Sequence, residues 1–347
     1  MALLTNRDPQ AVGDALARWI AQSTGAPNVR VLNAEHPSTG WSSETLLVDL
    51  AWSEPGDEHD HTHELVVRLP PPMVGTFRDY DLAQQTVAQT AAAAAGIAIA
   101  SPELVTDLTW LGTPFVVMPR VRGNIIGEVA ALDEWLISLT VSQRSKLHEA
   151  FVAVVATTHR ADLGAATGVP ARDNETELDF WADYLDWSSS GSPVPALVAA
   201  LEWCRINQPT TESEPVLLWG DVRFGNVIFG DDLSPRAVLD WDMASIGAPE
   251  HDVAWFTMLE STTRLLLGQH LAGFPDRDGT IAQYESLSGR TLDNMEWYET
   301  LALVRSTAIL SRIGYLHLSA GVPSPLPIDD NPLLDLLATR IAAADGR

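Results

Sequence analysis

The sequence predicts an α+β protein, with a strand-rich N-terminal part and a larger, mainly helical C-terminal part. In the first part, short β-branched and apolar runs are separated by clusters of Gly, Pro and Ser, which is typical of strands. The rest shows apolar residues at helical spacing. Near residue 220 this helical pattern is interrupted by two short apolar runs joined by a turn.

The expected elements follow from this patterning. The first helix covers residues 8–24, with Asp8 as its N-cap and Pro9 at its first position. Further helices are expected at residues 79–94, 142–160, 177–187, 196–204, 253–267, 281–287, 292–317 and 332–344. Strands are expected at residues 29–32, 45–52, 64–69, 101–105 and 114–118.

Composition narrows the class of protein. The net charge of −25 argues against nucleic acid as a partner, because phosphate binding needs a basic surface. A strong negative charge can steer a cationic substrate toward the protein. Alternatively, it is a general feature of the organism's proteins that serves solubility or salt tolerance. No apolar run approaches the ~18 residues of a membrane span, and the N-terminus lacks the pattern of a signal peptide. The single cysteine, Cys204, suits the cytoplasm. The oligomeric state stays open.

The stretch from residue 217 to residue 255 carries the clearest chemistry. Asp221 follows an apolar run, Asn226 ends the loop after it, and Asp240 follows a second apolar run beyond a turn. Two short strands joined by a turn bring such flanking side chains to one point. Two carboxylates and an amide there can hold Mg²⁺ on oxygen ligands and place a carboxylate beside a hydroxyl nucleophile.

Three motifs in this stretch resemble those of the aminoglycoside phosphotransferase family, in the branch related to kinase-like domains fused to acyl-CoA dehydrogenases. They are W-G-D-x-x-x-x-N at residues 219–226, L-D-W-D at 239–242 and D-V-A at 252–254. The resemblance implies a protein-kinase-like two-lobe fold. A small N-lobe with an antiparallel sheet would cover residues 1–118, and a mainly helical C-lobe would cover residues 119–347. It also implies transfer of the γ-phosphate of ATP or GTP to a small-molecule hydroxyl, with Mg²⁺.

By this resemblance, Asp221 is the catalytic base or orients the acceptor hydroxyl, while Asn226 and Asp240 hold magnesium. Arg223 would stabilise charge on the equatorial phosphate oxygens, or it bridges to a nearby acid. Asp242 either reaches a second metal or caps a turn.

Three further residues in or near these motifs have structural interpretations. Asp252 opens an apolar helix and is expected as its N-cap, and by resemblance it also braces the catalytic loop. Trp219 replaces the family's usual His and should alter local packing without abolishing chemistry. His159, near a helix C-terminus, is interpreted as structural.

The resemblance also places nucleotide contacts in the N-terminal part. The loop residues assigned to the phosphates are Ser38, Thr39, Gly40, Ser42 and Ser43. Arg68 stands where kinases carry a lysine, and Gln84 and Gln85 stand where a glutamate is expected. Arg68 is otherwise a surface arginine at a strand end. Lys146 is the only lysine, so a role that lysine usually has must be taken by Arg here or is not fulfilled. Met118 and Val121 lie at the expected hinge, where backbone groups would meet the nucleobase.

Two other functions remain open from the sequence. The variant phosphate contacts also fit a nucleotide-binding scaffold with little or no transfer activity. His59, His61 and His63 alternate within an acidic segment, as metal ligands on a strand can. The favoured interpretation is a solvated hairpin tip between two strands, which tolerates any polar sequence. The acceptor stays open, with aminoglycosides and hydroxyacyl-CoA derivatives as the candidate classes.

Overall fold

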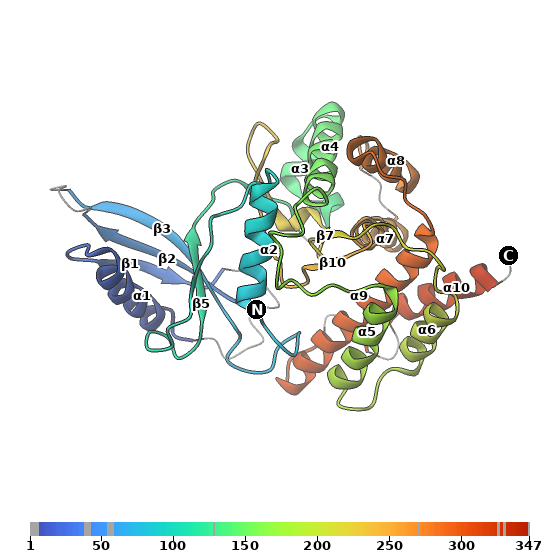
Figure 1. Cartoon of the computed structure of the whole chain (residues 1–347), viewed down its shortest axis with the longest axis horizontal. Coiled ribbons are helices and arrows are strands. Elements are labelled where there is room, and N and C mark those ends of the chain that lie inside the picture. The colour runs from blue at the N-terminus through green and yellow to red at the C-terminus, as the bar shows by residue number, and fades with distance from the viewer. Residues whose placement is uncertain are drawn as a thin grey trace. The chain divides into compact units, whose positions relative to one another are not determined.

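The computed structural model describes residues 7–37, 43–53, 59–127, 129–268, 271–324, 327–328 and 331–345. The chain divides into two compact units. Residues up to 86 together with residues 100–121 form the first unit, and residues 87–99 together with the chain from residue 122 onward form the second (Figure 1).

The first unit is built on one five-stranded antiparallel sheet with the strand order β1-β2-β3-β5-β4. Its strands are β1 (Arg30–Glu35), β2 (Glu44–Trp52), β3 (His61–Leu69), β4 (Glu103–Val105) and β5 (Phe115–Pro119). The expected strand-rich N-terminal part with an antiparallel sheet is therefore confirmed.

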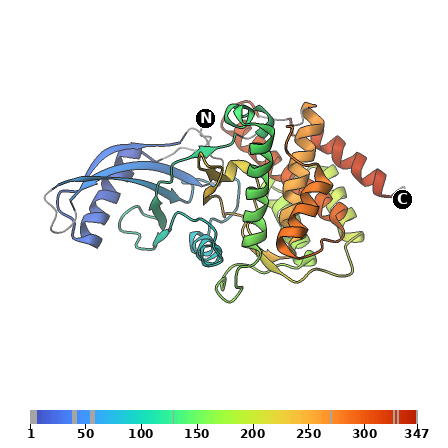
Figure 2. The same cartoon turned by 90° about the horizontal axis from the view of Figure 1, so that it is seen from above.

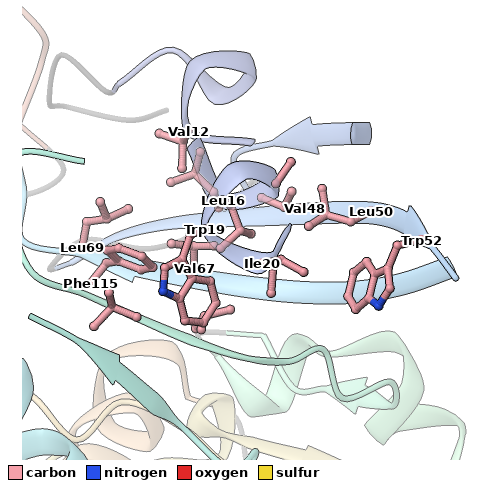
Figure 3. Close-up of a cluster of buried hydrophobic side chains, with 14 of the residues drawn as sticks. Val12, Leu16, Trp19, Ile20, Val48, Leu50, Trp52, Val67, Leu69 and Phe115 are labelled. Atoms are coloured by element: carbon pink, nitrogen blue, oxygen red, sulfur yellow. The ribbon is translucent and has the colours of Figure 1, made fainter. Parts of the chain in front are cut away.

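Helix α1 (Pro9–Thr24) covers one face of this sheet. Its N-cap is Asp8, whose carboxylate accepts a hydrogen bond from the backbone N–H of Gln10, as expected from the sequence. Figure 3 shows side chains of α1 pointing toward apolar side chains of β2, β3 and β5. The Trp19 ring meets Phe115 edge-on, with 5.8 Å between ring centroids. Burial of this face holds α1 on the sheet.

The alternation along β3 sets which residues face α1. Val67 and Leu69 are fully buried in the cluster with α1. The intervening Arg68 belongs to the opposite face, because successive strand side chains point to opposite sides. On that face Met118 and Val116 form a second apolar cluster with Leu82. The side chain of Met118 is thus part of a core.

The second unit contains two small antiparallel sheets. One pairs β6 (Asn124–Ile125), β8 (Val227–Phe229) and β9 (Pro235–Val238), and the other pairs β7 (Val216–Leu218) with β10 (Ser245–Gly247). Every residue of β7 and β8 is buried. Continuous burial explains why these strands read as apolar runs rather than as alternating patterns.

Helices make up most of the second unit (Figure 2). They are α3 (Glu134–Ser138), α4 (Val141–Thr158), α5 (Asn174–Ser188), α6 (Pro195–Ile206), α7 (Glu250–Leu267), α8 (Arg277–Ser288), α9 (Met295–Ser319) and α10 (Pro332–Asp345), with α2 (Leu82–Ala94) crossing the boundary between the units. Helix α7 packs against α9, and α4 packs against α8. No helix in the described part of the chain is both long and apolar enough to cross a membrane.

Some elements differ from the expectation. His61 and His63 belong to β3 rather than to the loop before it, and the His63 ring stacks on Trp52 with 3.3 Å between centroids. Strands β6 and β10 were not expected, because two- and three-residue strands carry no readable period. Their pairing depends on β8 and β7, which lie far along the chain.

The cluster beneath α1 gives a prediction about stability. Leu16 is fully buried. Leu16→Ala should lower the free energy of unfolding by about 2–5 kcal/mol, because the lost side chain leaves a cavity. The matched control is Leu32→Ala, at a residue that is 50% exposed. Its loss should be within about 0.5 kcal/mol. Denaturant unfolding of both variants measures the difference, and equal losses would contradict the assigned core.

Candidate active site

The carboxylate of Asp221 lies at the centre of a hydrogen-bond cluster in the second unit. The Asn226 side-chain amide donates to Asp221 Oδ2 at 2.8 Å and to the Asp221 carbonyl at 3.0 Å. Arg223 Nε donates to the same Oδ2 at 3.2 Å. The side chain of Asp221 keeps 19% of its surface exposed, so a small molecule can reach this carboxylate.

The β8–β9 hairpin brings Asp240 next to Asn226. The backbone N–H of Leu239 donates to the Asn226 carbonyl at 2.8 Å, immediately beyond the pairing of Val227 with Val238. Asp240 follows Leu239 and has a left-handed backbone, with φ 58°. Asp tolerates this conformation better than most residues. The hairpin therefore places the Asp240 backbone beside that of Asn226, whose side chain is itself hydrogen-bonded to Asp221.

Trp219 ties the segments of Asp221 and Asp240 together. Its side chain is fully buried, and its indole N–H donates to the carbonyls of Leu239 at 2.8 Å and Asp240 at 3.1 Å. Its ring also packs near Phe151 and Trp241. At the position where the family has His, the indole supplies both packing and a hydrogen bond to the second Asp segment.

Gly220 makes the turn into the loop that carries Asp221. Its φ is 93°, and a Cβ placed there would collide with the Met243 backbone carbonyl. Any side chain would thus meet both a strained conformation and backbone that cannot move aside. This requirement explains the glycine between Trp219 and Asp221.

Asp252 braces the same turn from α7. Its Oδ2 accepts from the Trp219 backbone N–H at 2.8 Å, and its Oδ1 accepts from the Gly220 N–H at 2.9 Å. His159 Nε2 lies 3.1 Å from Oδ2, and His159 Nδ1 lies 2.8 Å from the Tyr284 hydroxyl. An ionised carboxylate only accepts, so the N–H at Nε2 donates to Asp252.

This arrangement refines two expectations. The N-cap of α7 is Pro249, so the expectation that Asp252 is an N-cap is wrong. The brace expected from the resemblance is present instead. His159 has the structural role predicted for it, through a buried hydrogen bond to Asp252 rather than through the helix dipole.

The oxygen atoms near Asp221 fit a divalent cation such as Mg²⁺. The Asn226 amide nitrogen makes both bonds to Asp221, so its oxygen is the atom that can bind a metal, and the Asp240 carboxylate follows one residue after the backbone bond to Asn226. Carboxylate and amide oxygens are hard ligands of the kind Mg²⁺ prefers. Among described residues, no group of three or more His, Cys, Asp or Glu side chains is arranged for a metal, which gives the three-histidine hypothesis no support.

The residues assigned to the nucleotide lie in the first unit. Arg68 is on β3, opposite Thr45 and Val116 in the register, and Ser43 immediately precedes β2. Met118 is within β5 and Val121 lies just beyond it. The remaining loop residues of the prediction lie outside the described residues: Ser38, Thr39, Gly40 and Ser42.

Trp255 belongs to the site although the sequence analysis did not identify it. Its indole N–H donates to Asp221 Oδ1 at 3.0 Å. Helical spacing places it one turn after Asp252 on α7, so both side chains can reach the same loop. That spacing was the available signal, but tryptophans are common in this chain and most are explained by packing.

A small polar pocket lies between α4, α7 and α8. Its volume is about 20 Å³, which leaves room for roughly one water molecule. Burial raises the pKa of Glu260 to about 7 against the opposing effect of Arg264, and burial lowers the pKa of His148 to about 4. The pocket is lined by His148, Phe256, Thr257, Glu260, Ser261, Arg264, Phe274, Pro275, Asp276, Arg277 and Thr280. It shares no lining residue with the Asp221 cluster.

Comparison with known sequences matches the model of the phosphotransferase enzyme family to residues 34–287. Acyl-CoA dehydrogenase family member 11 of Pongo abelii is 25% identical over 251 residues, which are 69% of this chain and 31% of that protein. Member 10 of Mus musculus is 24% identical over 345 residues, 94% of this chain and 30% of that protein. This chain thus spans under a third of either relative.

Solved structures share the fold. A candidate aminoglycoside phosphotransferase from Ralstonia eutropha JMP134 is 19% identical with a TM-score of 0.69, covering 95% of this chain and 98% of its own. The GDP complex of aminoglycoside 2'-phosphotransferase-IIIa gives a TM-score of 0.52 at 13% identity, with coverage of 98% and 100%. A thermostable mutant of APH(4)-Ia bound to ADP and hygromycin B gives 0.53 at 14%, with coverage of 95% and 97%.

The turn at Gly220 gives a prediction with an internal control. Gly268 has φ 63°, with open space around an added Cβ. Gly268→Ala should therefore lower the free energy of unfolding by only about 1–2 kcal/mol. Gly220→Ala should cost more, because its Cβ also collides with the Met243 backbone. Denaturant midpoints of the two variants provide the comparison. A Gly220→Ala variant as stable as Gly268→Ala would show that the turn is not constrained as described.

The Glu260 pocket gives a prediction about pH. The pKa of the Glu260 carboxyl is higher in the folded than in the unfolded protein. This carboxyl therefore stabilises the fold when the pH is below its unfolded pKa, and the stabilisation is lost as the pH rises toward 7. The lowered pKa of His148 acts in the opposite direction, so Glu260→Gln should be compared with wild type at each pH. The unfolding free energy of Glu260→Gln relative to wild type should increase between pH 4.5 and pH 7. A difference independent of pH would contradict the shifted carboxyl.

Proposed function

Because this chain belongs to the phosphotransferase enzyme family, as its three motifs predicted, we propose that it transfers the γ-phosphate of ATP or GTP to a hydroxyl of a small molecule. The observation that carries the proposal is the Asp221 carboxylate, fixed by the Asn226 amide and still open to a small molecule. Its kinase-like fold, now also seen in solved relatives, supports it.

Asp221 would orient the acceptor hydroxyl and take its proton. Phosphoryl transfer with a loose transition state needs little base strength, so the larger contribution of Asp221 is placement of the hydroxyl. Arg223 already contacts Asp221 Oδ2, and in the proposed reaction it would help neutralise charge on the equatorial oxygens.

Asn226 and Asp240 would hold Mg²⁺ at the end of the hairpin. The bound ion would neutralise charge on the nucleotide phosphates. The contribution of this chain is to fix both ligands: Asn226 through its two bonds to Asp221, and Asp240 through the indole of Trp219.

Nucleotide binding is assigned to the first unit. GDP and ADP are bound by two of the solved relatives, which supports a nucleotide here. Backbone groups of Met118 and Val121 would meet the base, and Arg68 would bind phosphate in place of lysine. The loop residues Ser38, Thr39, Gly40, Ser42 and Ser43 complete the proposed set.

The acceptor class is the finer part of the proposal. Hygromycin B in one solved relative supports an aminoglycoside-like hydroxyl, and the acyl-CoA dehydrogenase relatives support a hydroxyacyl-CoA derivative. ADP or GDP formation over a panel containing both classes, with Mg²⁺, would identify it. Tight Mg²⁺-dependent nucleotide binding without acceptor-stimulated product would instead support the scaffold.

The role of Asp221 can be tested directly. Asp221→Asn should lower kcat by about 10²–10⁴-fold, because the amide cannot take the hydroxyl proton and offers fewer acceptor positions to place the hydroxyl. Nucleotide affinity should stay near that of the wild type. Asp231→Asn, in the exposed turn of the same hairpin, is the control and should keep its activity. Turnover of Asp221→Asn equal to wild type would refute the assignment.

A further inference from the structure

We propose that Trp255 is a positioning residue for the transfer reaction, and that its indole N–H orients Asp221 so that Oδ1 receives the acceptor hydroxyl. This inference rests on the proposed function and adds a residue that none of the three motifs contains. It follows from how the hydrogen-bonding capacity of Asp221 is used.

An ionised carboxylate has about four acceptor positions, two on each oxygen. Within the described part of the chain, Oδ2 accepts two side-chain bonds, from Asn226 Nδ2 and Arg223 Nε. Oδ1 accepts one, from Trp255 Nε1 at 3.0 Å. One acceptor position therefore remains on Oδ1, and the hydroxyl of the incoming acceptor molecule would occupy it. The indole sets the direction of that remaining position because it occupies the other.

The Trp255 ring is itself held in place by a buried cation. Arg305 Cζ lies 5.1 Å from the ring centroid of Trp255 and 5.3 Å from that of Trp181, so the guanidinium contacts both indoles. Stacking on aromatic faces is a property of arginine that lysine shares poorly. A cation on the face of an indole also draws electron density from the ring, which strengthens its N–H as a donor.

Glu177 neutralises this cation from α5. Its Oε1 lies 3.6 Å from Arg305 Nη1 and accepts from the Trp181 indole at 2.8 Å, while its Oε2 accepts from Arg172 at 3.0 Å. Burial alone would raise the pKa of Glu177, but Arg305 and Arg172 outweigh it and lower the pKa to about 2. Glu177 is thus charged at neutral pH, and its charge keeps Arg305 between the two indoles.

The chain of contacts therefore runs from Glu177 through Arg305 and Trp255 to Asp221. Its members come from α5, α9, α7 and the catalytic loop. Glu177, Arg305 and Trp255 are each buried. Because no member can move freely, the direction of Oδ1 is set before an acceptor arrives, which is the condition for an orientational gain in rate.

Trp255→Phe is the direct test, since Phe keeps the aromatic face against Arg305 and removes only the donor and part of the ring. We expect kcat to fall about 10- to 100-fold, as for loss of a hydrogen bond to a charged group. The KM values for nucleotide and acceptor should stay within about twofold, because the lost interaction orients the base rather than binding substrate.

The control is Trp297→Phe. Trp297 is also buried, and its indole N–H donates to the Cys204 carbonyl at 2.9 Å, away from Asp221. This variant should keep the wild-type kcat. If both variants lose activity to the same extent with unchanged KM, or if Trp255→Phe keeps the wild-type kcat, Trp255 has no positioning role.

The buried pair is tested by Arg305→Met combined with Glu177→Gln. Changing both residues removes the buried Arg305 charge together with the carboxylate that neutralises it. Arg172 also loses this carboxylate, but its side chain is 20% exposed. The double variant should lower kcat several-fold without changing KM, and wild-type kcat in a folded double variant would overturn the part assigned to Arg305.

In every case the turnover of the wild type is measured first. An inactive wild type contradicts the proposed function, whereas an active wild type together with a fully active Trp255→Phe variant contradicts only this inference.

Discussion

The candidate active site depends on one carboxylate that takes no part in the proposed chemistry. Asp252 accepts the backbone N–H groups of Trp219 and Gly220, and His159 donates to the same side chain from the end of α4. All of these groups are buried, where an unmade hydrogen bond costs about 1–3 kcal/mol each. The start of the loop that carries Asp221 is therefore fixed by α7 and α4, and its position depends on how those two helices pack.

Two kinds of constraint, the local geometry of a hairpin and contacts between distant segments, place the other residues of the Asp221 cluster relative to this turn. Short-range geometry of the β8–β9 hairpin sets Asn226 beside Leu239 and thus delivers Asp240. Long-range contacts then orient the side chains: the Trp219 indole holds the Asp240 backbone, and the Trp255 indole holds Asp221. Two tryptophans thus serve as hydrogen-bond donors as well as core residues. A ring that is mostly apolar can do this inside a core because it buries one polar group only.

These two kinds of constraint explain what could be predicted from the sequence. The hairpin that brings the segments of Asn226 and Asp240 together was predictable, because turn residues and apolar runs within about twenty residues encode it. Trp255, Arg305 and Glu177 were not, because their meeting depends on packing among α5, α7 and α9, which no local pattern reveals. The expectation that Asp252 caps α7 was wrong for a related reason. An acidic residue near a helix start fits a cap equally well, and only the position of the distant Gly220 turn decides between the two roles.

The left-handed backbone at Asp240 has a consequence for the evolution of this chain. Its φ is 58°. In this region most residues cost about 1–2 kcal/mol more than Gly, Asn or Asp. Glu and His carry that penalty here, so few substitutions of Asp240 avoid backbone strain. A descendant that loses the acid can keep its fold most readily through Asn or Gly. Under the proposed function, either residue at this position in a related chain would indicate that the fold was kept after the metal ligand was lost.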